Sequence, residues 1–162
     1  MALLEKFIRR QRARRLLSRI QPGSRILEIG SGSGWVRDAL NSGMIYIGLD
    51  IQPPADIVGD VRNWRSLGLS DGSFDVIIAF EVVEHVDCFK ECVELLRPGG
   101  ILLCTTPSPR WDWVLNILET IGINQKRTSP HDHLVDLKTV RYFRQREVWS
   151  FLILTQWAVL TK

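Results

Sequence analysis

The stretch Ile26-Leu27-Glu28-Ile29-Gly30-Ser31-Gly32-Ser33-Gly34 carries the signal that decides the fold. Its apolar first half predicts a short buried strand, and residues 35–42, after the glycines, are predicted to form a helix. Glycines in such a turn let the backbone bend sharply and approach a ligand closely, and N–H groups of the following helix face that ligand. The sequence therefore predicts a ligand-binding turn between a strand and a helix.

The spacing within this turn restricts the class of ligand. A dinucleotide-binding turn needs a third small residue five positions after its first glycine, and that position here is Trp35. No Lys-Ser or Lys-Thr pair follows the glycines, so the phosphate-binding loop of nucleoside triphosphatases is excluded as well. The Glu28 carboxylate, two residues before Gly30, would repel a phosphate and attract a cation. We therefore expect a positively charged, nucleoside-like ligand without phosphate.

Strands and helices alternate along the rest of the chain. Strands are expected at residues 25–29, 45–50, 55–59, 74–80 and 101–105, with one or two more in 147–161, and helices at 87–97, 111–121 and 138–145. Several of the strands are continuously apolar, which is typical of a sheet covered on both faces. The sequence predicts an α/β fold with a single doubly wound, mostly parallel sheet that is abbreviated at its C-terminal strands.

Three further acidic residues follow predicted strands, at the sheet edge where ligands of such folds bind. Asp50 lies 20 residues after Gly30, where a carboxylate can accept hydrogen bonds from both hydroxyls of a ribose. Asp60 can accept from an exocyclic amine, or it can instead cap the short helix expected to begin near Arg62. Glu81 follows the strongest predicted strand.

Composition and charge limit the class of protein. The chain of 162 residues, 45% of them hydrophobic and 24% charged, suits one globular domain, and its three cysteines cannot form a disulfide framework. No apolar run reaches the roughly 20 residues that span a membrane, so we expect a cytoplasmic protein.

Positive charge is concentrated at the N-terminus. The first 20 residues hold seven basic side chains and one acidic one, although the whole chain carries only +3. We expect residues 1–22 to form a basic helix ahead of a domain that spans 23–162. Arg9 to Arg15 allow three interpretations: a solvated helix face, an arm that binds an anionic partner, or a membrane-surface helix.

Five stretches follow one another in a distinctive order. They are ILEIGSGSG (26–34), YIGLD (46–50), GDV (59–61), FDVIIAFEVVEHV (74–86) and LLRPGGILLCTTP (95–107). Together they resemble the motifs of class I S-adenosylmethionine-dependent methyltransferases, of the small group that includes the type 11 and ubiquinone-biosynthesis-like enzymes. The resemblance implies a Rossmann-like methyltransferase fold with S-adenosylmethionine as cofactor.

The resemblance also implies roles for the residues of the first two motifs. Gly30, Gly32 and Gly34 would line the methionine part of the cofactor, with Glu28 on its ammonium side. Asp50 would hold the ribose hydroxyls.

The next two motifs supply the remaining residues that the resemblance places around the cofactor. Ile51, after the second motif, and Val61 would flank the adenine, whose amino group Asp60 would bind. Phe80 and Glu81 would border the sulfonium.

One histidine is a candidate catalytic residue on the acceptor side. His133, in His131-Asp132-His133, lies in a segment where related enzymes bind the acceptor, and a histidine suits the removal of an acceptor proton. The alternative is that this segment is a solvated polar loop. The side chains of Trp111 and Trp113 could line a binding site for an aromatic or lipid-like acceptor, or they could simply pack against the rest of the protein.

His85, Cys88 and Cys92 share one predicted helical face and are residue types that can bind a metal ion. The sequence offers no fourth ligand nearby, and both cysteines lie in an apolar stripe, so we expect no metal.

The predicted function is methyl transfer from S-adenosylmethionine to a small-molecule or lipid-linked acceptor. One alternative is a cofactor-binding partner protein without transferase activity. The other is an RNA methyltransferase recruited by the basic helix, although Phe80-Glu81-Val82-Val83 stands where amino-directed nucleic-acid enzymes carry Asn-Pro-Pro-Tyr.

Overall fold

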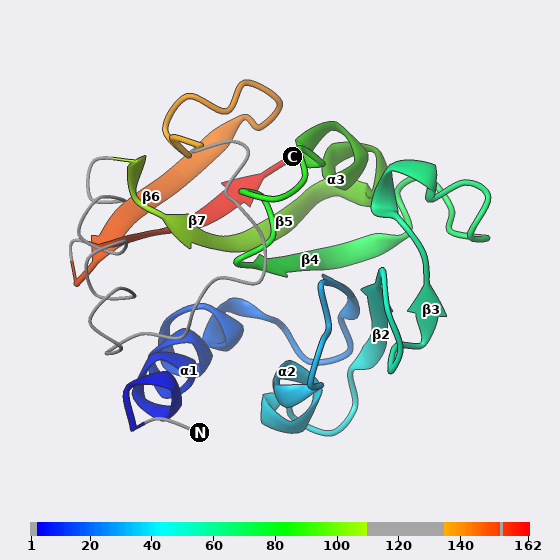
Figure 1. Ribbon diagram of the computed structural model, residues 1–162. Coiled ribbons are helices and arrows are strands. Elements are labelled where there is room, and N and C mark those ends of the chain that lie inside the picture. The colour runs from blue at the N-terminus through cyan, green and yellow to red at the C-terminus, as the bar shows by residue number, and fades with distance from the viewer. Residues whose placement is uncertain (1–2, 110–134, 153) are drawn as a thin grey trace.

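Seven strands form one sheet in which only β7 runs against the others (Figure 1). The computed structural model describes residues 3–109, 135–152 and 154–162. The order across the sheet is β3-β2-β1-β4-β5-β7-β6. The strands are β1 (Arg25–Ile29), β2 (Ile45–Asp50), β3 (Ile57–Val58), β4 (Phe74–Phe80), β5 (Leu96–Pro107), β6 (Gln145–Phe151) and β7 (Thr155–Thr161). The helices are α1 (Leu3–Arg15), α2 (Trp35–Ala39) and α3 (Phe89–Leu95), with 3-10 turns η1 (Leu17–Arg19) and η2 (Val61–Asn63).

The central strand β1 sets the register of the parallel part of the sheet. Ile29, its last residue, pairs with Leu49 of β2 and with Ala79 of β4. The three strands therefore end side by side, and the loops that follow them meet at one edge. This is the edge where the sequence places its motifs, because parallel strands bring their carboxyl ends together.

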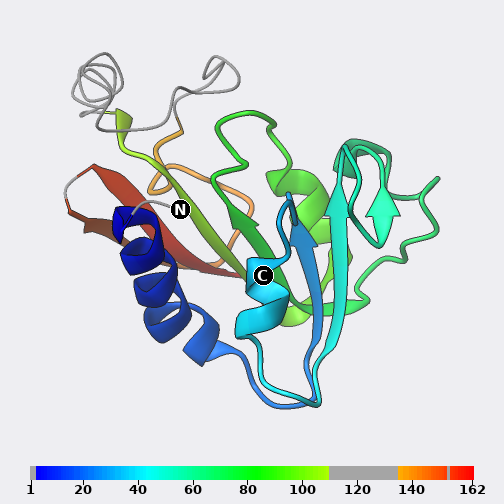
Figure 2. The ribbon, with the colours of Figure 1, turned by 60° about the horizontal axis from the view of Figure 1, so that its bottom comes forward.

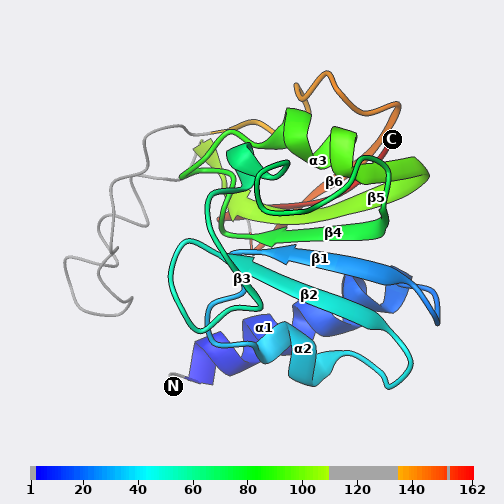
Figure 3. The same ribbon diagram turned by 90° about the vertical axis from the view of Figure 1, so that its right-hand side faces the viewer.

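Helices cover both faces of the sheet, as the continuously apolar strands predict. Figure 3 shows α1 and α2 on one side of the sheet and α3 on the other. Alternate strand residues divide between two apolar cores: Ile26, Ile78 and Trp157 pack under α1, η1 and α2, whereas Leu27 and Ile77 pack under η2 and α3. Within the described part of the chain, no helix has the length and apolarity to cross a bilayer.

The C-terminal end of the sheet is complete, so the prediction of abbreviated strands is wrong. β6 and β7 each contain seven residues and pair along their whole length as a hairpin. β7 also pairs antiparallel with β5, from Ile101 opposite Thr161 to Pro107 opposite Thr155. Residues 145–161 are enough for two strands because only positions 152–154 separate them.

The helix predicted at 138–145 does not form. Residues 136–144 are turns and irregular chain, in which the Asp136 carboxylate accepts a hydrogen bond from the Lys138 N–H at 3.0 Å. Leu137, Val140 and Phe143 are buried, and their spacing of three imitates a helical face although they pack from an irregular segment. The predicted helix at 111–121 lies outside the described residues.

Candidate cofactor site

The glycine turn after β1 has a backbone that only glycine adopts readily. Gly30, Gly32 and Gly34 have φ of +74°, +44° and +74°, in the left-handed region. At Gly30 a Cβ atom would also lie 2.6 Å from Cγ2 of Val82. The N–H groups of Gly30 and Ser31 both donate to the Leu49 carbonyl, at 2.8 and 3.2 Å, which fixes the turn against the end of β2.

Asp50 joins the glycine turn to the end of β2. Its Oδ2 accepts a hydrogen bond from the Gly32 N–H at 2.9 Å, and its Oδ1 accepts from the Gln52 N–H at 3.1 Å. Each carboxylate oxygen can accept more than one hydrogen bond, so both keep capacity for a ligand hydroxyl. Ile51, the next residue, is 71% exposed, and its large apolar side chain is therefore available to cover a flat ring.

Asp60 caps a helix, as the alternative interpretation predicts. Its Oδ1 accepts from the Arg62 N–H at 2.9 Å, and its carboxylate also pairs with the Arg62 guanidinium, with Nη2 at 2.5 Å. This pairing holds the pKa of Asp60 below its usual range. Val61, which the resemblance places beside the adenine, is buried in the core below η2.

Glu28 is buried beneath the turn rather than open beside it. It is 2% exposed, and its carboxyl group accepts a hydrogen bond from the hydroxyl of Tyr46. Burial raises the pKa of Glu28 to about 7, although the Tyr46 hydrogen bond and the nearby Arg37 charge oppose that rise. At neutral pH this group is therefore divided between its protonated and charged forms.

Glu81 meets the N-terminal helix at the end of β4. Arg12 of α1 forms an ion pair with the Glu81 carboxylate, which also accepts from the Thr105 hydroxyl at 2.9 Å. The Arg12 guanidinium lies over the Phe80 ring, 5.4 Å from its centroid, and the Phe80 ring also stacks with Trp35, at 5.9 Å between centroids. Arg12 is only 11% exposed, so it is not part of a solvated face.

Glu84 adds a second carboxyl group behind Glu81. It is 1% exposed, and its Oε2 accepts no hydrogen bond from the described residues. Burial first, and then the neighbouring charge of Glu81, raise the pKa of Glu84 well above its usual range.

Sequence reasoning missed Arg12, Tyr46, Thr105 and Glu84 as parts of this site. Tyr46 could have been found from the strand register, because Ile26 and Tyr46 pair and residue 28 then lies on the same face. Arg12 gives no such signal, since its partner is 69 positions away in the chain.

Of the remaining predicted residues, two cysteines are buried in the core, and three others lie outside the described part of the chain. Cys88 and Cys92 are buried in the core below α3, and the hydrogen bond with Cys88, followed by burial, raises the pKa of Cys92. Across 3–109, 135–152 and 154–162, no cluster of His, Cys, Asp and Glu could hold a metal ion. His133, Trp111 and Trp113 lie outside the described residues.

Comparison with known proteins agrees with this fold. A model of the methyltransferase domain family matches residues 3–162. A "Probable S-adenosylmethionine-dependent methyltransferase" of Mycolicibacterium smegmatis is 34% identical over 123 residues, which are 63% of this chain and 47% of that protein. A "Ubiquinone biosynthesis O-methyltransferase" of Cereibacter sphaeroides is 33% identical over 102 residues, covering 52% of this chain and 41% of the relative. The chain thus spans less than half the length of these two relatives.

Solved structures show the same fold at low sequence identity. A crystal structure of a SAM-dependent methyltransferase from Archaeoglobus fulgidus superposes with a TM-score of 0.70 at 16% identity, covering 97% of this chain and 94% of that one. A protein of Pyrococcus horikoshii OT3 gives a TM-score of 0.73 at 16% identity, covering 99% and 92%. The family match over nearly the whole chain and the shared architecture lead to one conclusion. The chain belongs to the methyltransferase domain family and has the fold of the class I S-adenosylmethionine-dependent methyltransferases.

Proposed function

We propose that this chain transfers a methyl group from S-adenosylmethionine to a small-molecule or lipid-linked acceptor. The observation that supports it most is the contact between Asp50 and the Gly32 N–H, which sets a carboxylate beside a left-handed glycine turn. When bound, S-adenosylmethionine supplies a methyl group that its sulfonium makes electrophilic.

The residues present fit this cofactor. Asp50 would accept from the ribose hydroxyls, and the exposed side chain of Ile51 would cover the adenine, whereas the side chain of Val61 is buried and offers no surface to it. The turn leaves room beside the backbone at Gly32 and Gly34, where no side chain projects, whereas Val82 fills the space beside Gly30.

The charges of the site would favour a cation over a phosphate. Glu28 would lie on the ammonium side, Asp60 would accept from the adenine amine, and Phe80 with Glu81 would border the sulfonium. Arg12 partly neutralises Glu81, so the carboxylate would orient a cation without holding it as a bare ion pair.

For the acceptor, we propose a hydroxyl or amine group deprotonated with help from His133. Positioning alone supplies much of the catalysis of a methyl transfer, and a general base typically adds about 10² to 10⁴ in rate. The name of the Cereibacter relative, an O-methyltransferase of ubiquinone biosynthesis, supports a lipid-linked acceptor.

The cofactor assignment is tested by calorimetry with S-adenosylmethionine, its demethylated product and NAD. We expect micromolar binding of the first two and none of NAD. Asp50→Ala should weaken binding by about 1.5–3 kcal/mol, the usual effect of losing charged hydrogen bonds. Asp71→Ala is the matched control, because Asp71 is exposed in the turn before β4. Tight NAD binding, or equal effects of Asp50→Ala and Asp71→Ala on cofactor affinity, would rule out S-adenosylmethionine as the cofactor bound at this site.

The acceptor side is tested by comparing His133→Ala with His85→Ala, using candidate phenols with and without prenyl tails. We expect His133→Ala to lower turnover at least about tenfold while cofactor affinity and melting temperature stay unchanged. His85→Ala should act mainly on stability. Cofactor binding without transfer to any acceptor would favour a binding protein instead.

A further inference from the structure

The basic side chains of α1 separate onto two faces of the helix. Arg9 pairs with Glu5 of the same helix at 2.5 Å and lies over the ring of Trp35, and Arg12 pairs with Glu81 at the end of β4. Lys6, Arg10 and Arg14 follow one another at intervals of four residues and are all exposed. None of these three makes an ion pair with another described residue, so the outer face of α1 carries three uncompensated cations in a row.

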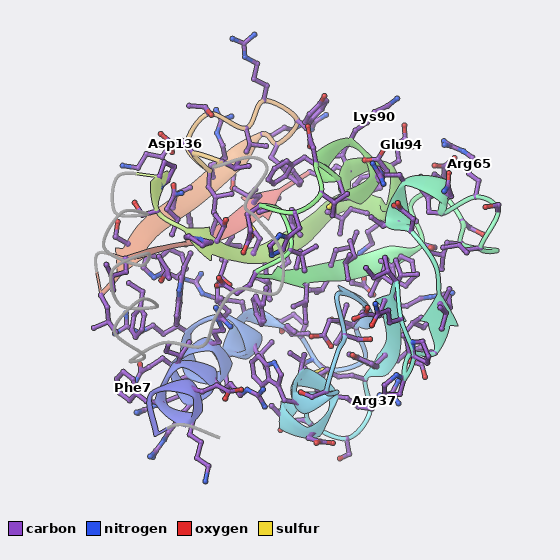
Figure 4. The ribbon with its side chains drawn as sticks, in the orientation of Figure 1. Phe7, Arg37, Arg65, Lys90, Glu94 and Asp136 are labelled. Carbon is purple, nitrogen blue, oxygen red and sulfur yellow. The ribbon has the colours of Figure 1, made fainter. Side chains whose placement is uncertain are left out.

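Two exposed apolar side chains lie beside these cations. Phe7 is 45% exposed, and its ring lies 6.2 Å from that of Phe151, the last residue of β6. Leu152, the next residue, is 53% exposed in the turn of the β6–β7 hairpin and has φ of +49°. Figure 2 shows the hairpin beside α1, and Figure 4 shows Phe7 on α1, on the side of the molecule away from Arg65.

This surface lies at the same edge of the sheet as the candidate site. The hairpin turn follows Phe151, which pairs with Thr155, and Thr155 in turn pairs with Pro107 at the carboxyl end of β5. On α1 itself, Arg12 contacts Glu81 at the carboxyl end of β4. The exposed cations and apolar groups therefore lie at the edge of the sheet that carries the candidate site.

We propose that this surface, made of Lys6, Phe7, Arg10, Arg14 and Leu152 and called here the α1 face, binds the surface of a bilayer that contains anionic lipids. The three cations would neutralise lipid phosphates, and Phe7 and Leu152 would enter the boundary between headgroups and acyl chains. A bilayer fits better than RNA because both Phe7 and Leu152 can enter its apolar boundary, whereas only Phe7 could stack on a base. Docking would hold the site against the membrane, where a lipid-linked acceptor lies. This last step rests on the proposed function.

The test uses the full chain, without cofactor or acceptor, so it can fail separately from the proposed function. The chain is sedimented with vesicles of phosphatidylcholine alone and of phosphatidylcholine mixed with phosphatidylglycerol. We expect binding only to the mixed vesicles and a loss of binding as salt rises. Each cation near such a surface strengthens binding about fivefold, so the triple variant Lys6→Gln, Arg10→Gln, Arg14→Gln should bind roughly a hundredfold more weakly.

A matched control removes the same charges elsewhere. Lys138→Gln, Arg141→Gln, Arg144→Gln changes one lysine and two arginines that are exposed in the irregular segment before β6, and it should bind like the unaltered chain. Leu152→Asn should weaken vesicle binding several-fold without unfolding the turn, because asparagine tolerates positive φ better than leucine does. Calorimetry with S-adenosylmethionine should give the same affinity for all three variants.

Three outcomes would overturn the proposal. The first is no sedimentation with mixed vesicles at low salt. The second is an equal loss in the two triple variants, which would show that net charge alone matters. The third is tight binding of a single-stranded RNA that depends on Lys6, Arg10 and Arg14 while the vesicles stay unbound, which would assign the α1 face to a nucleic acid.

Discussion

At Gly30 two separate constraints exclude a side chain, whereas at Gly34 only one does. Both residues have φ of +74°, but a Cβ at Gly30 would meet Val82 at 2.6 Å and a Cβ at Gly34 would meet no atom within 4 Å. Gly34→Ala should therefore cost about 1–2 kcal/mol of unfolding free energy from backbone strain alone. Gly30→Ala should cost more, by about 1–3 kcal/mol.

Urea denaturation of the two glycine variants measures this difference. Adding Val82→Ala should recover part of the loss in Gly30→Ala and none of the loss in Gly34→Ala. Equal stabilities of the two single variants would mean that the turn moves away from Val82 at no cost.

Glu28 should make the stability of the protein depend on pH. Its pKa is about 7 in the folded chain, above the 4.5 of an ordinary glutamate side chain, so folding favours its protonated form. The contribution of the protonated Glu28 to the free energy of unfolding is complete below pH 4.5 and is lost as the pH rises through 7. Glu28→Gln removes the titration, and we expect the variant to gain up to about 3 kcal/mol relative to the unaltered chain between pH 4.5 and pH 8.

The check is a series of urea denaturations of both proteins across that pH range. Comparing the two chains at each pH removes the contribution of Glu84, whose raised pKa is common to both. A constant stability difference across the range would show that Glu28 does not titrate there.

At the scale of elements, Arg12 holds α1 on the sheet. In the sequence it looks equivalent to the other basic residues of this helix. Arg12→Ala removes the ion pair with Glu81 and the contact with the Phe80 ring. We expect a loss of about 1–2 kcal/mol of unfolding free energy, because Glu81 is part-exposed and keeps Thr105 as a partner. Arg10→Ala should change stability by less than about 0.5 kcal/mol. Thermal unfolding of both variants decides whether the two positions differ.

Elements whose signal is local were predictable from the sequence. β1, β2 and β4 have the predicted bounds because each is an apolar run that ends at a motif residue. The prediction at 138–145 was wrong because a spacing of three also arises when an irregular segment turns buried residues toward a core. The glycine turn and Asp50 contact each other as their motifs suggest, since both lie next to strand ends in the register of β1 and β2. The partnership of Arg12 with Glu81 depends on how α1 packs, which no local pattern encodes.

At the scale of the whole molecule, the basic N-terminal segment is also structural. Leu16, Leu17 and Ile20, which follow α1, are buried against β1, β4 and β7 in the core that α2 completes. Deleting residues 1–19 would therefore not remove a separate arm, because it would also open one face of the sheet to water. Point substitutions on the α1 face leave this core in place, and they are the sounder way to test binding of anions.

The deletion itself gives a prediction for the whole fold. Burying a leucine side chain contributes about 1.5–3 kcal/mol, so losing Leu16 and Leu17 together should remove about 3–6 kcal/mol. Domains of this size are stable by only about 5–15 kcal/mol, and the deleted chain should therefore melt at a much lower temperature and bind a dye that reports exposed apolar surface. The triple glutamine variant of Lys6, Arg10 and Arg14 should melt like the unaltered chain, since all three side chains are exposed. An unchanged melting temperature in the deleted chain would show that α2 and the sheet close this core without α1 and η1.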